Sequence, residues 1–121
     1  MNRYSQTSGR WTLDNGSVLG AGYSGNGPGK NNGHLQMLEN IGPIPQGEYR
    51  IGGAFTHPSK GPLVMNLIPK DLSKTYDRSG FLLHGDSISD PGNASHGCIV
   101  LPHDVRQKIA DCKDKDLTVI Y

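Results

Sequence analysis

The chain has 121 residues, 12 of them basic and 11 acidic, and its formal net charge is +1. Because no long run of one sign occurs, the charge pattern excludes an electrostatic binder of nucleic acid or of a membrane surface. No apolar stretch approaches the roughly 20 residues that span a bilayer, so no membrane span is expected. The length fits a single domain over residues 1–121, and 17 glycines and 8 prolines favour short strands joined by turns.

The first elements in chain order are a hairpin and a loop. Asn15-Gly16 lies between the apolar runs 10–13 and 17–19, and both of its residues accept a positive φ, which predicts a β-hairpin. Residues 25–33 are rich in glycine and asparagine and predict a surface loop. Residues 42–47 contain two prolines, which fix φ and remove backbone donors, and they predict a rigid extended turn.

Runs of apolar or alternating residues predict the later strands. These strands cover residues 48–51, 63–68, 80–84, 99–101 and 117–120. A helix is predicted where Leu101, Val105 and Ile109 recur every four residues. Cys112 falls on the same stripe, which predicts a core position for its side chain. The sum is a mainly β fold with one or two short helices.

The residues that carry chemistry lie in one segment, 81–101. Cys98 follows Ser95-His96-Gly97, and His84 precedes the cysteine by 14 positions. A thiol becomes a good nucleophile when an imidazole takes its proton, so the two residues predict a cysteine nucleophile with a histidine base. Gly97 leaves room for backbone N–H groups to approach a substrate oxyanion, and Ser95 could donate a further hydrogen bond.

At this point a family resemblance is evident. Ser95-His96-Gly97-Cys98-Ile99, with His84-Gly85 upstream, resembles the signature of L,D-transpeptidase catalytic domains, the YkuD-like family. Residues 22–25, 31–32, 42–49 and 78–86 are similar to a compact subgroup of that family, which includes antibacterial effectors delivered by type VI secretion systems. The resemblance runs from about Trp11 to Leu101, which is most of the chain.

This resemblance implies an L,D-transpeptidase-like β-sandwich that acts without a cofactor. It implies that Cys98 is the nucleophile, His84 the base and the Gly85 carbonyl the group that orients the imidazole. The implied substrate is the tetrapeptide stem of peptidoglycan, in which Cys98 attacks the carbonyl of the third, diamino acid residue and the terminal D-alanine leaves. The thioester then passes to water, to a D-amino acid or to another stem's amine, which trims, exchanges or cross-links the stem.

One position departs from the family pattern. Housekeeping members usually carry Arg or Asn two places after the cysteine, where this chain has Val100. The missing donor favours a peptidoglycan-acting toxin over a cross-linking housekeeping enzyme, which remains one alternative. A non-catalytic module that binds peptidoglycan is the other alternative.

Several further side chains have two possible roles. His96 assists catalysis or only forms a wall of the cleft, and Asp86 contacts a substrate amine or holds its own loop. The candidates for substrate binding are Tyr23, Gly85, Asp86 and Asn93.

Two alternatives would give Cys98 a different role. His84, His96, Cys98 and His103 could supply nitrogen and sulfur ligands, but their spacing matches no common closed zinc site, so no metal is expected. A disulfide between Cys98 and Cys112 is the other possibility, and the Ser-His-Gly context of Cys98 favours a free thiol instead.

The expected partners and location follow from the resemblance. The partners are a peptidoglycan stem peptide, a periplasmic immunity protein and a spike or tube component of a secretion system. Residues 1–9 are polar and have no apolar core of the kind that a secretory signal needs. We therefore expect a protein that is made in the cytoplasm and acts in the periplasm of a target cell.

Overall fold

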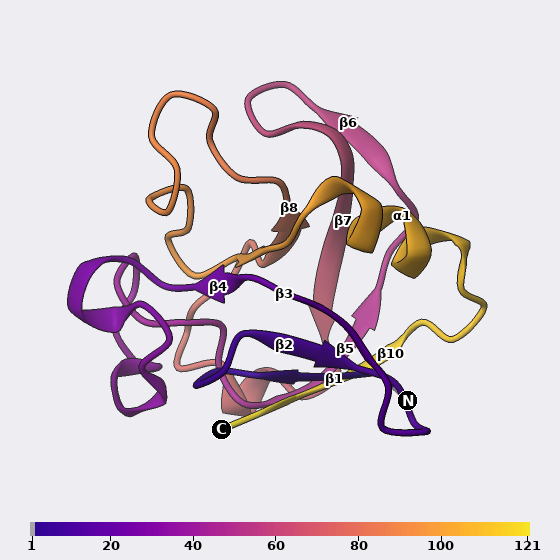
Figure 1. The fold of residues 1–121 in the computed structure, drawn as a ribbon. Coiled ribbons are helices and arrows are strands. Elements are labelled where there is room, and N and C mark those ends of the chain that lie inside the picture. The colour runs from indigo at the N-terminus through magenta and orange to yellow at the C-terminus, as the bar shows by residue number, and fades with distance from the viewer. Residues whose placement is uncertain (1) are drawn as a thin grey trace.

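Ten short strands form one mixed sheet in the computed structural model, which describes residues 2–121 (Figure 1). The strands follow the order β3-β2-β1-β10-β5-β7-β8-β9-β4, and β6 pairs with β7 outside this path. Their bounds are β1 Asn2–Ser5, β2 Arg10–Thr12, β3 Val18–Ala21, β4 Tyr23–Ser24, β5 Gly47–Ile51, β6 Phe55–His57, β7 Gly61–Pro69, β8 Leu82–His84, β9 Ile99–Val100 and β10 Asp116–Ile120. The β1–β10 and β8–β9 pairs are parallel, and the others are antiparallel.

Helical structure is sparse along the described part of the chain. The helix α1 covers His103–Asp111, and three 3₁₀ turns cover Gly27–Gly29 (η1), Gly33–Leu35 (η2) and Leu72–Lys74 (η3). None of the helices within residues 2–121 has the length and apolar character that crossing a bilayer requires. The expectation of a mainly β fold with a short helix is confirmed.

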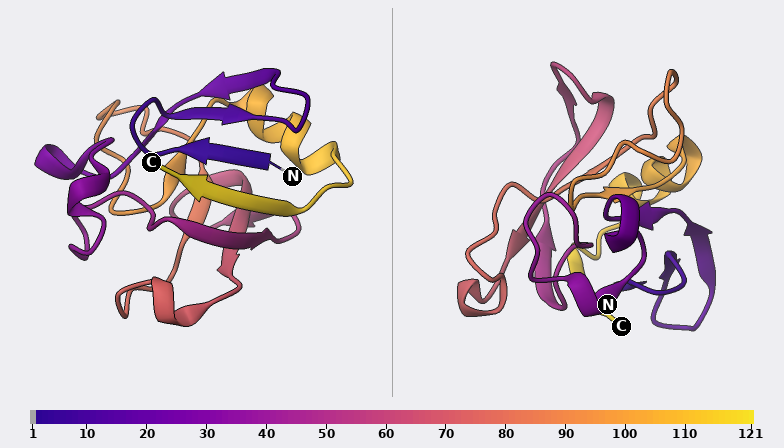
Figure 2. Two further views of the ribbon diagram at one scale, coloured as in Figure 1. Left: turned by 90° about the horizontal axis from the view of Figure 1, so that it is seen from below. Right: turned by 90° about the vertical axis from the view of Figure 1, so that its left-hand side faces the viewer.

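The core lies between two halves of the bent sheet. Figure 2 shows β3, β2, β1, β10 and β5 side by side, and Figure 1 shows β1, β2 and β10 running across the direction of β7, whereas β5 pairs with β7 and joins the two halves. Tyr4 and Trp11 from the first half pack in one buried cluster with Leu83 and Ile99 from the second half. The helix α1 adds Val105 and Ile109 to the same cluster, so the stripe that predicts the helix also buries it.

The predicted hairpin is present, whereas the prediction for Cys112 is wrong. β2 and β3 pair across residues 13–17, and Gly16 takes a φ of 84° in the turn. α1 ends one residue before Cys112, whose backbone is extended and whose side chain is half-buried outside the core cluster. The stripe therefore stops at Ile109, because the chain leaves the helix before another turn is complete.

Candidate active site

The register of β8 and β9 places His84 and Cys98 on one face of the sheet. His84 lies beside Val100 in this parallel pair, and Cys98 directly precedes β9, next to Leu82 when the register is continued by one residue. Side chains alternate along a strand, so positions 82, 84, 98 and 100 face the same side. His84 and Cys98 are therefore diagonal neighbours on adjacent strands, and a strand spacing of about 4.8 Å with a rise of about 3.3 Å per residue puts such residues roughly 8 Å apart at their Cα atoms.

The imidazole of His84 is fully buried and held in one tautomer. Its Nδ1 lies 2.8 Å from the carbonyl oxygen of Gly85, and a carbonyl only accepts, so Nδ1 carries the proton. Its Nε2 has no hydrogen-bond partner among the described residues. Burial lowers the pKa of His84, and the positive charges of Lys60 and Arg106 lower it further, against the Gly85 bond. The result is a neutral ring with an unused lone pair.

The thiol of Cys98 is half-buried. Its Sγ lies 3.8 Å from the carbonyl oxygen of Gly80, and the backbone N–H of Leu82 also points to it. Burial raises the pKa of this thiol, while the Leu82 N–H and the charges of Lys60 and Arg78 act in the opposite direction. Because Nε2 of His84 is unpartnered, no hydrogen bond joins the two side chains in this resting arrangement, a looseness common in enzymes without substrate.

Ser95 and Gly97 shape the turn that presents the cysteine. The buried Ser95 hydroxyl donates to the carbonyl of Cys98 at 2.6 Å and accepts from the N–H groups of Gly25 and Gly97. The one hydroxyl proton of Ser95 is therefore used inside the turn. Gly97 has a φ of 122°, a conformation that side chains rarely adopt, and a Cβ there would meet the guanidinium of Arg78.

Arg78 lies beside the turn of Cys98, although no pattern in the sequence marks it. Its guanidinium is buried and donates to the carbonyls of Gln36, Gly42 and Pro43, so it joins the turn of Cys98 to the segment 36–43. These partners lie 35 to 42 positions away in the sequence. The patterns that predict strands and helices relate residues a few positions apart, so they cannot predict contacts at this separation.

Tyr23 closes the loop between the two proposed catalytic residues. Its hydroxyl donates to Asp86 at 2.6 Å and accepts from the N–H of Ala94 at 2.9 Å, so it ties both ends of the loop 85–96 to β4. Burial and the bond to Asp86 raise the pKa of Tyr23 to about 12. Partial burial acts to raise the pKa of Asp86, but hydrogen bonds from Tyr23, Gly92 and Ser87 lower it below its ordinary value.

A cavity of about 800 Å³ adjoins the site. It lies between the β6–β7 turn and the loop 85–96, which stand side by side at the top of Figure 1. Gly85 and His96, the chain neighbours of the proposed base and of the Gly97-Cys98 pair, are among the lining residues. His96 and Asn93 are both exposed, and Asn93 also donates to Asp90 from its side chain at 2.9 Å. Of the sequence candidates, Gly85, Asp86, Asn93 and His96 thus share one cavity.

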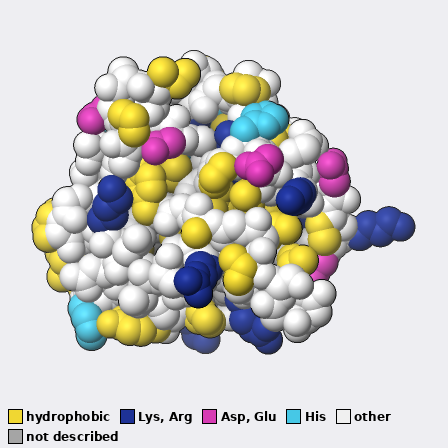
Figure 3. Space-filling model, in the orientation of Figure 1, with side chains coloured by type: hydrophobic (Ala, Val, Ile, Leu, Met, Phe, Trp, Pro, Cys, Tyr) yellow, Lys and Arg dark blue, Asp and Glu magenta, His cyan; other side chains and the backbone are white. Residues whose placement is uncertain are grey.

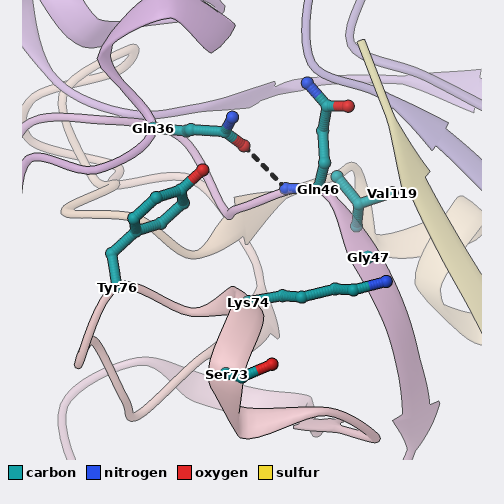
Figure 4. Close-up of a pocket in the computed structure, with 7 residues that line it drawn as sticks. All are labelled: Gln36, Gln46, Gly47, Ser73, Lys74, Tyr76 and Val119. Carbon is teal, nitrogen blue, oxygen red and sulfur yellow. Dashed lines mark hydrogen bonds between the residues drawn. The ribbon is translucent and has the colours of Figure 1, made fainter.

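A second hollow, of about 470 Å³, lies near the start of β5. Figure 4 shows its lining, in which Tyr76 and Lys74 lie below Gln36, and the side-chain oxygen of Gln36 accepts from the backbone N–H of Gln46. None of the candidate catalytic or substrate-binding residues lines it. The candidates Tyr23 and Asp86 also line a further hollow of about 330 Å³, together with Val100 and Arg106.

The disulfide and the metal site considered for Cys98 can both be compared with residues 2–121 of the structure. Both cysteines are free, so no disulfide joins Cys98 to Cys112. No three His, Cys, Asp or Glu side chains in that range are grouped as a metal ion would require. On the face that Figure 3 draws, charges of both signs are interspersed and no broad patch of one sign occurs.

Comparison with known proteins adds one finding. The sequence model described as "Tlde1 domain" matches residues 19–119, which is most of the chain and includes every candidate site residue. No curated protein matches the chain.

Proposed function

Since the chain belongs to the Tlde1 domain family, a family of type VI L,D-transpeptidase-like effectors, we propose that residues 1–121 act as one cysteine-dependent catalytic domain. Its substrate is the tetrapeptide stem of peptidoglycan. Cys98 is the nucleophile, His84 is the base, and the terminal D-alanine is the leaving group. An antibacterial role agrees with this activity, because trimming or exchanging the terminal D-alanine alters the stems from which the wall is built.

The state of His84 is the observation that carries the proposal. Its Nδ1–H is fixed on Gly85, its Nε2 is buried without a partner, and it shares a sheet face with Cys98. An unsatisfied buried nitrogen is costly, typically about 1–3 kcal/mol, and such atoms call for a reason in a folded protein. Accepting the Cys98 proton is a reason that agrees with the geometry.

The reaction runs in two halves. In the first, Nε2 of His84 takes the proton of the Cys98 thiol while Sγ attacks the carbonyl carbon of the third stem residue. The proton then passes to the nitrogen of D-alanine, the C–N bond breaks, and a thioester remains on Cys98. In the second half, His84 takes a proton from water or from the amine of a D-amino acid, which attacks the thioester and restores the thiol.

The enzyme can be tested with purified tetrapeptides and mass analysis of the products. Wild type should release D-alanine or exchange it for an added D-amino acid. Cys98→Ala should lose more than about 10³-fold in turnover while its circular dichroism stays native, because the covalent path is gone. Full activity in a folded Cys98→Ala protein would end the mechanism. Binding without turnover by wild type would favour the non-catalytic module.

The family also supports two partners. A protein that attacks the wall of sister cells requires an immunity protein in the periplasm, and we propose that this protein covers the cavity beside His84 and Cys98. Delivery as an effector requires contact with a spike or tube component of the secretion system.

A further inference from the structure

Arg106 is a buried cation with no carboxylate partner. The side chain is only 6% exposed, and no carboxylate among residues 2–121 forms an ion pair with it. Its Nε donates to the carbonyl of Leu101, and its Nη1 donates to the carbonyls of Pro62 and Leu63 at 3.0 and 2.9 Å. These bonds fix the plane of the guanidinium, but they leave its full positive charge uncompensated.

One nitrogen of this guanidinium is unused. Nη2 forms no hydrogen bond in the described structure, and it lies 2.6 Å from where a Cβ on Gly85 would stand. Gly85 and Arg106 line the same cavity. A residue larger than glycine at position 85 would cover this nitrogen. The glycine therefore keeps a donor of a rigid, charged fork open to the cavity, which is the geometry that binds carboxylates.

Lys60 adds a second positive charge to this cavity. It lies at the β6–β7 turn, its side chain is half-buried, and it has no ion-pair partner among the described residues. Its charge acts on both His84 and Cys98, so it stands near the reacting groups. The cavity is thus bounded by two unpaired cations close to the place where the substrate's scissile bond must lie.

The loop 85–96 gives the cavity charges of the opposite sign. Asp86 and Asp90 also line it. Asp86 is held by Tyr23 and by backbone N–H groups, and Asp90 by Asn93, so neither neutralises Arg106 or Lys60. A ligand with only a negative charge would be repelled by Asp86 and Asp90, which weakens its binding. A group that carries an ammonium and a carboxylate on one carbon would satisfy both sides of the cavity at once.

We propose that this cavity binds a zwitterionic amino-acid head group of the substrate, with its carboxylate on Arg106 Nη2 and Lys60 and its ammonium toward Asp86 and Asp90. The proposal rests on the proposed function and names the substrate feature that the site recognises. It also assigns a carboxylate donor to a chain that has Val100 where housekeeping relatives carry Arg or Asn. Two sources supply such a group: the side-chain end of the stem's diamino acid, and a free D-amino acid that acts as acceptor.

Affinity should be measured on Cys98→Ala, so that the result does not depend on turnover. Three tetrapeptides differ only at the end of the third residue: one carries ammonium and carboxylate (diaminopimelate), one ammonium and carboxamide, and one ammonium alone (lysine). By titration calorimetry, the zwitterionic peptide should bind at least about tenfold more tightly than the other two. Adding Arg106→Gln should remove this preference and leave the affinity for the other two peptides unchanged.

Arg50→Gln is the matched control, because it removes one exposed cation from β5, away from the cavity. It should keep the tenfold preference. Arg106 also donates to three backbone carbonyls, so its replacement can disturb the fold. Lys60→Gln is therefore the second variant, and it should weaken the preference while these three hydrogen bonds stay in place.

A second arm identifies the source of the head group. In the active enzyme, a site for the free D-amino acid predicts that Lys60→Gln and Arg106→Gln raise the D-alanine concentration for half-maximal exchange. The three peptides should then bind alike, because such a site does not take the end of the stem's third residue.

Equal binding of the three peptides together with unchanged exchange in both variants would overturn the proposal. Failure of the proposed function would give a different result: the protein would still prefer the zwitterionic peptide, but wild type would turn over none of the three peptides.

Discussion

Burial acts on the two proposed catalytic groups in opposite directions. It raises the pKa of the Cys98 thiol and lowers the pKa of the His84 imidazole, and each shift favours the uncharged form. The resting pair is therefore a thiol beside a neutral imidazole and not a thiolate beside an imidazolium. Proton transfer to His84 must then accompany the attack, which keeps the thiol unreactive until a carbonyl is in place.

The pH profile should report this state of His84. Because the pKa of His84 is lowered, the ring stays neutral to a lower pH, and the acid limb of kcat/KM should lie below about 6.5. Lys60→Gln removes a positive charge that lowers this pKa, so the limb should move to higher pH. An acid limb above 6.5 in wild type, or a downward shift in the variant, would contradict this account.

Gly97 offers a test of the turn before the cysteine. Gly97→Ala should destabilise the protein by about 1–3 kcal/mol from its φ of 122° alone, and by more because its Cβ meets Arg78. Gly16→Ala is the control, since Gly16 also has a positive φ but nothing lies within 4 Å of its Cβ. Urea denaturation should give the larger loss for Gly97→Ala, and equal losses would mean that the Arg78 contact is unimportant.

At the scale of elements, the hydroxyl of Tyr23 joins both ends of the loop 85–96 to β4. Tyr23→Phe removes the bonds to Asp86 and Ala94 and leaves the aromatic ring in place. Amide hydrogen exchange across residues 86–94 should quicken, and KM should rise because this loop walls the cavity. Tyr121→Phe removes a hydroxyl whose one bond among residues 2–121 is to His34, and it should change neither quantity. Unchanged amide hydrogen exchange in Tyr23→Phe would show that other contacts hold the loop.

Elements whose residues alternate or repeat in the sequence were predictable, and elements defined by distant partners were not. β5, β7, β10 and α1 carry their own apolar patterns, so local reasoning finds them. β1 is polar and forms through its parallel pairing with β10, more than 110 positions away. β4 has two residues and exists only through its pairing with β9. Neither strand leaves a local signal.

The same limit applies to the candidate site. Cys98 and His84 can be recognised from the sequence because the motif Ser95-His96-Gly97-Cys98 and the upstream His84-Gly85 are each contiguous in the chain. Nothing in the sequence around Arg78 and Arg106 distinguishes them from surface arginines. Folding buries Arg78 beside the turn of Cys98 and Arg106 beside the cavity. Lys60 likewise becomes informative only when the β6–β7 turn places it near Cys98. Charges without partners can be recognised only after every possible partner has been placed.

At the scale of the whole molecule, the proposed activity predicts where the protein is harmful. Its substrate lies outside the inner membrane, so expression in the cytoplasm of a susceptible bacterium should be nearly harmless. Export to the periplasm by a fused signal peptide should cause swelling or lysis, measured as loss of optical density and viable count. Exported Cys98→Ala should be harmless at equal protein level. Equal killing from the cytoplasm would mean that the wall is not the target.

The position of β10 has a consequence for how the protein comes into being. This strand lies between β1 and β5 in the sheet, so a strand from near the end of the chain fills the space between two that are made much earlier. Until residues 116–120 have left the ribosome, β1 and β5 have open edges and the core has no Leu117 or Val119. The nascent domain therefore cannot complete its sheet or its core before residues 116–120 have emerged from the ribosome.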